Sequence, residues 1–259
     1  RLEPLQRRML QVACVIGRQF SLPVLRIILS TMSDEEFNAA LARLVERDFV
    51  RPQPDAPETE FIFRHVVVSD AIYSTLLKRD RSELHGLAGQ AIETIYADRL
   101  ESQVDVLARH FSWSAFKDRA LHYLVLAGQK AARVYLNNQA RQQFEEALSL
   151  LPQVDHAPQQ ALQISMGLGD ILVLTGEYPA ARSHYQSALQ LLIGLDPDRY
   201  ATDKSTLLRK VATTHERQGD YESALRYLTQ AEPTLTTTPQ QTAVQLPLLH
   251  NYNGSIKMR

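Results

Sequence analysis

The sequence predicts a mainly all-α protein, in which an N-terminal helical domain with a small β-hairpin precedes an α-solenoid of helical hairpins. Two observations lead to this fold class. Small and large residues recur at a fixed spacing in the C-terminal half, and three helical patterns followed by two short β-type segments occupy the N-terminal quarter. We therefore expect an N-terminal domain at 1–77, a helical connector at 78–114, and about three repeats with a truncated fourth at 115–259.

The repeats are visible as three segments that align without gaps. Each contains a residue pair that ends in glycine or alanine: Ala127-Gly128, Leu168-Gly169 and Val211-Ala212. An alanine follows at the same distance in each segment, with a period of 41 and then 43 residues, at Ala140, Ala181 and Ala224. One large residue stands four positions further on: Phe144, Tyr185 and Leu228. This pattern predicts hairpins whose two helices cross closely around a single large side chain.

The turn between the two helices of each hairpin carries its own signals. Gly176 and Gly219 are suited to the left-handed backbone conformation in which a helix commonly ends. Pro179 is suited to the first turn of the helix that follows. The first repeat has Tyr135-Leu136-Asn137-Asn138 at this place and lacks the glycine.

These residues resemble the tetratricopeptide repeat (TPR) family, over about 115–259. The repeat from Leu168 to Ala188 resembles the family most, and a fourth repeat is expected to begin at Asn253-Gly254. The period is longer than the roughly 34 residues usual in the family, so we expect longer helices or linkers. The alternative is an unrelated helical bundle in which the alanines recur by chance.

The resemblance implies a curved solenoid whose concave face binds a protein or peptide partner. By family position, that face would present nine residues from the first helices of the three repeats: His122, Gln129, Arg133, Gln163, Met166, Asp170, Arg209, Thr213 and Glu216. Their mixture of charges and polar groups suits an extended peptide or a helix better than a phosphate. The alternative is that these residues form only the solvated face of a stacking spacer.

The N-terminal part reads as three helices and a hairpin. The helices are predicted at Glu3–Val15, at Leu22–Leu29 and from Ser33 onward, where Ser33 and Glu36 form a capping box. The hairpin is predicted from Phe49-Val50-Arg51 and Glu60–Phe63, joined by a turn that contains Pro52, Pro54 and Pro57. Three helices followed by a hairpin make a winged-helix-like domain.

The third of these helices is the one that would enter the major groove of DNA. Over Ser33–Asp48 it carries five acidic residues against two basic ones, Arg43 and Arg47. Duplex binding draws most of its affinity from neutralising phosphates, so this helix is a poor DNA reader. The net charge of −1 also gives no field that attracts nucleic acid or an anionic membrane. A DNA-binding regulator therefore stays only as an alternative function.

Two motifs after the hairpin, Phe63-Arg64-His65 and Leu107-Ala108-Arg109-His110-Phe111, occur in an order that is similar to another family. Over roughly 1–150 the chain resembles the region downstream of the nucleotide-binding core in STAND ATPases (signal-transduction ATPases with numerous domains). The nearest group is the bacterial one linked to cyclase, kinase or LuxR-type output domains. The resemblance implies a regulatory arm whose winged helix packs on an upstream ATPase core. A free-standing TPR adaptor is the other alternative.

The same resemblance places a histidine near the nucleotide phosphate. His65, with Arg64 beside it, occupies the comparable position, so the pair is a candidate nucleotide-sensing site. The alternative is that His65 caps a helix or packs against the wing.

Catalytic and cofactor motifs are missing from the sequence. It contains no phosphate-binding loop with a Gly-Lys-Ser/Thr ending, no Gly-x-Ser-x-Gly elbow and no His-Glu-x-x-His, so neither an enzyme activity, a metal nor a cofactor is predicted for this chain. The histidines His85, His110 and His122 are interpreted as packing or surface residues. Cys14 is the single cysteine, which fits a reducing, cytoplasmic compartment, and its apolar surroundings predict a buried thiol. No apolar run approaches the length of a membrane helix.

Overall fold

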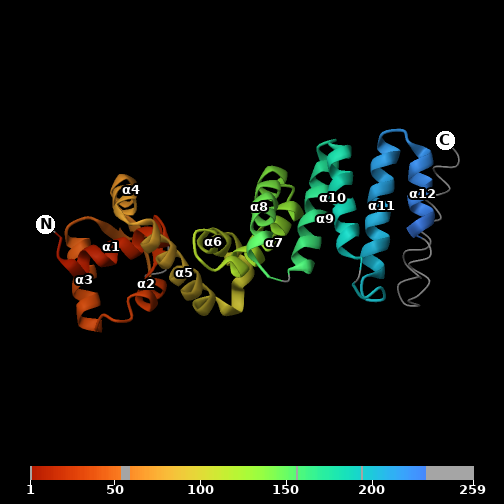
Figure 1. Cartoon of the computed structure of the whole chain (residues 1–259). Coiled ribbons are helices and arrows are strands. Elements are labelled where there is room, and N and C mark those ends of the chain that lie inside the picture. The colour runs from red at the N-terminus through yellow and green to blue at the C-terminus, as the bar shows by residue number, and fades with distance from the viewer. Residues whose placement is uncertain (1, 54–58, 156, 194, 232–259) are drawn as a thin grey trace. The chain divides into compact units, whose positions relative to one another are not determined.

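The computed structural model describes residues 2–53, 59–155, 157–193 and 195–231. Pro54, Pro57 and the expected fourth repeat at Asn253-Gly254 lie outside these residues. The chain divides into two compact units, of which the first is Arg1–Tyr123 and the second begins at Leu124. Figure 1 follows the helices from red at the N-terminus to blue.

The first unit begins with three helices and a small sheet. In chain order its elements are α1 (Pro4–Ile16), β1 (Gln19–Ser21), α2 (Leu22–Ile28), α3 (Asp34–Glu46), β2 (Val50–Pro52) and β3 (Glu60–Phe63). Both outer strands pair antiparallel with β3, in the order β1-β3-β2. The three predicted helices and the two predicted strands are confirmed, whereas β1 was not predicted.

Local sequence signals explain where these helices begin. Ser33 accepts a hydrogen bond from the Glu36 backbone N–H, and the Glu36 carboxylate accepts one from the Ser33 N–H at 2.9 Å. This is the predicted capping box, which satisfies two backbone donors that the start of α3 would leave unpaired. Below the helices, Phe20 of β1 and Phe63 of β3 meet edge to face with ring centroids 5.7 Å apart.

The rest of the first unit is helical. It contains α4 (Val66–Thr75), α5 (Lys78–Ile95), the short 3₁₀ helix η1 (Ala97–Arg99) and α6 (Leu100–Ser112). Arg109 of α6 donates a hydrogen bond to the Ile16 carbonyl at the end of α1, at 3.2 Å. Cys14 is buried in α1, and burial raises the pKa of its thiol to about 12, as its apolar neighbours predicted.

The second unit is a row of antiparallel helix pairs. Its elements are the C-terminal part of α7 (Lys117–Arg133), then α8 (Asn137–Leu150), η2 (Leu151–Gln153), α9 (Pro158–Leu174), α10 (Tyr178–Leu191), α11 (Ala201–Arg217) and α12 (Tyr221–Ala231). The helices from α9 to α12 stand side by side in Figure 1, each against the next. The predicted repeats are therefore helical hairpins.

Each hairpin closes around one large side chain, as the spacing predicted. Phe144, Tyr185 and Leu228 are all buried. A Cβ placed on Gly128 would lie 2.8 Å from the Phe144 ring, and one on Gly169 would lie 2.3 Å from the Tyr185 ring. Real Cβ atoms do not approach so closely, so the two aromatic side chains require glycine on the facing helix. In the third hairpin Ala212 stands in place of the glycine, and the smaller Leu228 packs in the same core as this alanine.

The three turns within the hairpins share one backbone conformation. In each, a residue with positive φ is followed by an N–H that bonds back to the helix: Leu136 to Ala131, Glu177 to Leu172 and Asp220 to His215. Gly176 and Gly219 have φ of 81° and 79°, as predicted. At the matching position of the first turn Tyr135 has φ of 60°, so a tyrosine adopts the conformation that glycine adopts in the other two.

Among the described residues, no helix is both long enough and apolar enough to cross a membrane.

Candidate functional site

A groove lies on the first helices of the first two hairpins. It has a volume of about 410 Å³ and is lined by residues of α7, α8 and α9: Gln129, Ala132, Arg133, Phe144, Gln163, Met166, Gly167 and Asp170. Five of the nine residues predicted for the concave face therefore line one groove. Whether they bind a partner stays a prediction.

The floor of the groove is apolar because two glycines let an aromatic ring approach. The Phe144 ring lies against Gly128 of α7, and a Cβ on Gly167 of α9 would lie 2.5 Å from it. The phenylalanine thus fills the space between two successive hairpins, buried directly beneath the groove. Met166 and Ala132 extend this apolar floor, and the flexible thioether of a methionine adapts to different apolar groups.

The walls of the groove are polar. The half-buried amides of Gln129 and Gln163 come from α7 and α9, and each amide can both donate and accept hydrogen bonds. Arg133 adds a positive charge at the exposed end of α7. This combination of an apolar floor and paired amide groups suits the main chain of an extended polypeptide, with one apolar side chain directed at the floor.

Asp170 holds the second and third hairpins together at one end of the groove. Its Oδ1 accepts a hydrogen bond from the Tyr185 hydroxyl at 2.7 Å and a charge-assisted one from Lys210 of α11. Burial, and then the Asp170 charge, raise the pKa of the Tyr185 hydroxyl above its ordinary value. Asp170 therefore contributes an ion pair with Lys210 to the groove instead of an isolated negative charge.

The other four predicted residues do not line this groove. His122 is exposed on the part of α7 that belongs to the first unit. Arg209, Thr213 and Glu216 are half-buried on α11, where burial lowers the pKa of Arg209. The Thr213 hydroxyl donates to the Arg209 carbonyl at 3.0 Å.

Three lining residues were absent from the predicted set. Phe144 was predicted only as the large side chain of the first repeat, and no role in binding was predicted for Ala132 or Gly167. A signal was present for one of them, because Gln163, Met166, Gly167 and Asp170 form one stripe at helical spacing.

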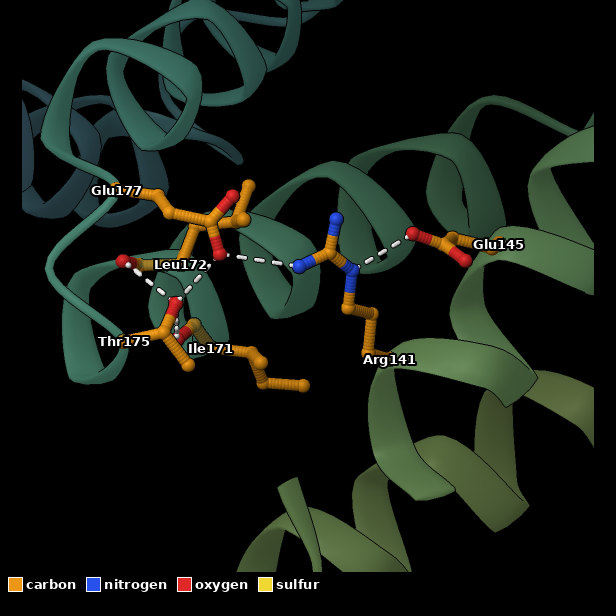
Figure 2. Close-up of polar contacts among 6 residues, drawn as sticks. All are labelled: Arg141, Glu145, Ile171, Leu172, Thr175 and Glu177. Atoms are coloured by element: carbon orange, nitrogen blue, oxygen red, sulfur yellow. Dashed lines mark hydrogen bonds and ion pairs between the residues drawn. The ribbon is translucent and has the colours of Figure 1, made fainter. Parts of the chain in front are cut away.

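Arginines on the second helices connect successive hairpins. Figure 2 shows Arg141 of α8, whose guanidinium contacts Glu145 at 2.8 Å and Glu177 of the next turn at 3.0 Å. Thr175 donates to the same Glu177 carboxylate at 2.9 Å. One repeat later Arg182 donates to Gln218 of the following turn at 2.8 Å. Both arginines therefore link one hairpin to the turn of the next.

The candidate nucleotide-sensing pair lies on the surface of the first unit. His65 is the N-cap residue of α4, but its exposed side chain makes no capping hydrogen bond. Arg64 is exposed and pairs with Asp48 at 3.3 Å. The nucleotide-sensing role of this pair stays a prediction.

Two of the three histidines interpreted as packing or surface residues are buried against each other. Nδ1 of His85 and Nδ1 of His110 are 3.0 Å apart, and Nε2 of His85 lies 3.0 Å from the Tyr73 hydroxyl. Burial is the main cause that lowers the pKa of His85 to about 4 and that of His110 to about 3. Both rings are therefore neutral at pH 7, with one proton between the two Nδ1 atoms.

Within the described part of the chain, no group of three or more His, Cys, Asp or Glu side chains is arranged to hold a metal ion.

Comparison with known proteins gives a family match for part of the repeats. Residues 160–236 match the tetratricopeptide repeat family. This match covers α9 to α12, and it indicates that the repeats are a protein-interaction module. It does not extend over the first unit.

Longer proteins also match the chain. An uncharacterized protein of Rhizobium meliloti is 27% identical over 190 residues, which are 71% of this chain and 18% of that protein. The chain thus spans less than a fifth of this relative's length. Among solved structures, one similar chain comes from the crystal structure of the APC/C hetero-tetramer Cut9-Hcn1, with a TM-score of 0.37, 14% identity and coverage of 90% of this chain and 46% of that one.

Proposed function

We propose that the second unit binds an extended polypeptide segment of a partner protein in the groove between α7, α8 and α9. The observation that carries this proposal is the convergence on one groove of five residues that the TPR resemblance places on the concave face: Gln129, Arg133, Gln163, Met166 and Asp170. The TPR match, which begins at residue 160, supports the same conclusion for the α9 side of the groove.

The mode of binding follows from the lining. The Gln129 and Gln163 amides bind main-chain N–H and C=O groups of the segment, while an apolar side chain contacts Met166 and Ala132. Arg133 favours an acidic residue next to that apolar side chain, because the Asp170 charge at the other end is already offset by Lys210.

A peptide-display selection on the immobilised chain tests this function. Selected peptides are synthesised, and their affinity is measured by fluorescence anisotropy against the wild-type chain and the double variant Gln163→Ala/Met166→Ala. We expect a loss of at least about tenfold in affinity, because the substitutions remove one amide and part of the floor. Gln190→Ala, on the exposed side of α10, is the matched control and leaves the affinity unchanged. Peptides that bind the double variant as tightly as the wild type would show that the groove is not the binding site.

For the first unit, we propose a winged-helix domain that packs on the ATPase core of a longer, STAND-type regulatory protein. The element order of α1, β1, α2, α3, β2 and β3, with its three-stranded sheet, supports the winged-helix assignment. The exposed Val67, at 72% of its full accessible area, follows His65 by two residues and gives this face an apolar group that a neighbouring domain could cover. The much greater length of the Rhizobium meliloti relative leaves room for such a core.

The open reading frame upstream of Arg1 gives the first test, since the proposal requires a phosphate-binding loop there. In the longer protein, His65→Ala is then expected to speed nucleotide release at least about threefold, measured with a fluorescent nucleotide. His122→Ala, another exposed histidine, is the control. Absence of the loop, or equal release from wild type and His65→Ala, contradicts the role of His65.

A further inference from the structure

The groove of the first two hairpins has a filled counterpart between the second and third hairpins. The repeat alignment pairs three lining positions with positions one repeat later: Gln129 with Asp170, Phe144 with Tyr185, and Gly167 with Lys210. The three later residues form one contact. The Lys210 ammonium bonds the Asp170 carboxylate and lies 5.7 Å from the centre of the Tyr185 ring. In this second interface an unbranched side chain therefore runs from α11 across an aromatic ring to an acceptor on α9.

The first interface does not supply this side chain itself. Gly167 stands where Lys210 stands one repeat later, and the Phe144 ring takes the place of the missing Cβ, which would lie 2.5 Å from it. Further out, the path from Gly167 to Gln129 is lined by both residues and belongs to the groove of about 410 Å³. The groove thus includes the space of one unbranched side chain, which the partner segment can fill.

The end of this path differs in charge between the two interfaces. In the second interface the receiving group is the Asp170 carboxylate, which pairs with the Lys210 ammonium. In the first interface the receiving residue is the uncharged Gln129, and the groove is also lined by Arg133. An ammonium in a half-buried place needs a carboxylate to offset its desolvation, so this path disfavours a cation. The side chain that fits is unbranched, like that of lysine, and uncharged.

We propose that the apolar side chain which the groove takes from its partner segment is a methionine, whose end lies beside Gln129. This inference rests on the proposed function, and it names the side chain that the floor of the groove selects. Methionine is unbranched and uncharged, and its flexible thioether adapts to the floor formed by Met166 and Ala132. Isoleucine and valine are branched and stiff at the carbon that must enter first, and lysine brings a charge without a carboxylate to receive it.

Exchanging the receiving residue tests the proposal. Gln129→Asp gives the first interface the acceptor that the second one has, so the preferred side chain should change from methionine to lysine. Phage-displayed random peptides of about 12 residues, enough to span the groove, are selected in parallel on the wild-type chain and on Gln129→Asp, and sequenced. We expect methionine to be enriched at one peptide position on the wild type, and lysine at that position on the variant.

Synthetic peptides that differ only at that position then measure the change by fluorescence anisotropy. The wild type should bind the methionine peptide at least about tenfold more tightly than the lysine peptide, and Gln129→Asp should reverse this order. The norleucine peptide, which keeps the shape without sulfur, should bind the wild type within about threefold of the methionine peptide. The isoleucine peptide should bind at least about fivefold more weakly.

Two further variants serve as controls. Gln190→Asp makes the same change of charge on the exposed side of α10 and should keep the preference for methionine. Thermal unfolding shows whether Gln129→Asp is folded. Should it unfold, Gln129→Glu replaces it, because glutamate also supplies a carboxylate and is a stronger helix former than aspartate.

The outcomes separate this inference from the proposed function. If the methionine and lysine peptides keep the same affinity ratio on Gln129→Asp, or if the isoleucine peptide binds as tightly as the methionine peptide, the inference is wrong. Loss of binding in Gln163→Ala/Met166→Ala would then still support the groove as the binding site. If the peptides bind that double variant as tightly as the wild type, the proposed function fails and the inference fails with it.

Discussion

In the second unit each helix pair closes over one large side chain opposite a small residue, whereas in the first unit α5 and α6 combine one such contact, Gly89 against Phe111, with a pair of buried histidines. The hydrocarbon contacts recur at Gly128 with Phe144 and at Gly169 with Tyr185. The histidine contact occurs once, between His85 and His110, which lie 25 residues apart in the sequence. The contacts at Gly128 and Gly169 depend on shape and recur with the repeats. The contact between the two histidines depends instead on which ring nitrogen carries a proton.

The largest effect expected from this difference concerns the fit at Gly169. Gly169→Ala should destabilise the chain by about 3 kcal/mol, because the new Cβ would lie 2.3 Å from the buried Tyr185 ring. Adding Tyr185→Leu should recover most of this loss, since the pair would then match Ala212 and Leu228 of the third hairpin. Urea unfolding of the single and double variants measures the coupling.

Gly176→Ala is the matched control for this experiment. It substitutes a glycine with no neighbour within 4 Å, where only the positive φ opposes a side chain. Its cost should be about 1 kcal/mol, and Tyr185→Leu should not reduce it. If Tyr185→Leu fails to reduce the cost of Gly169→Ala, the explanation by shape is wrong.

Acid should weaken the first unit through its histidine pair. Because the folded-state pKa values of about 4 and 3 lie below the ordinary 6.5, the unfolded chain binds more protons between pH 6.5 and pH 4. The stabilisation is therefore complete above pH 6.5 and is lost as the pH falls, by about 2 kcal/mol for the two histidines together at about pH 5.8. Trp113, the single tryptophan, stacks on His85 and reports on this unit alone by fluorescence.

The double variant His85→Gln/His110→Leu is the control for the pH experiment. Its stability at pH 7 should be lower than that of the wild type, but the slope of stability against pH should be smaller between pH 6.5 and pH 5. An unchanged slope would show that other groups cause the acid sensitivity.

A smaller effect is expected where a tyrosine occupies a position that glycine holds in the sibling turns. Tyr135→Gly should stabilise the chain by about 1 kcal/mol, because it removes the left-handed strain without removing a buried contact. Thermal unfolding measures this gain. A lower melting temperature would mean that the exposed ring makes a stabilising contact.

The smallest effect is expected at the arginines between hairpins. Arg141→Ala should lower the melting temperature by no more than about 1 °C, because its ion pairs with Glu145 and Glu177 are exposed to solvent. About 1 M salt should abolish this difference. The effect of Arg182→Ala should survive the salt, since its partner Gln218 is neutral. Equal salt sensitivity in both variants would contradict an electrostatic origin for the Arg141 contact.

The features that could be predicted from sequence are those set by local or repeated spacing. The positive φ of Gly176 and Gly219, the capping box at Ser33 and the buried Phe144, Tyr185 and Leu228 all follow from residues a few positions apart. Five groove residues were predicted from their positions in the TPR family, because equivalent helices place equivalent positions on one face.

The features that escaped prediction depend on distant partners. β1 is only three residues long and exists because β3, some forty residues later, supplies its hydrogen bonds. The His85–His110 contact needs two helices to meet at one register, which neither helix specifies alone. The sequence shows that the first turn has no glycine, but it does not show that Tyr135 adopts the left-handed conformation. That conformation accompanies the hydrogen bond from the Leu136 N–H to the Ala131 carbonyl, which the other two turns also make.

The matched glycine–tyrosine and alanine–leucine pairs also restrict how such an array can grow by recombination. A crossover inside a hairpin that joined α9 to α12 would set Gly169 against Leu228 and leave a void. The reciprocal product would set Ala212 against Tyr185 and produce a clash. A crossover between the second and third hairpins keeps both of these pairs together. A crossover after the first hairpin must in addition preserve Gly167, because a Cβ at that position would lie 2.5 Å from the Phe144 ring.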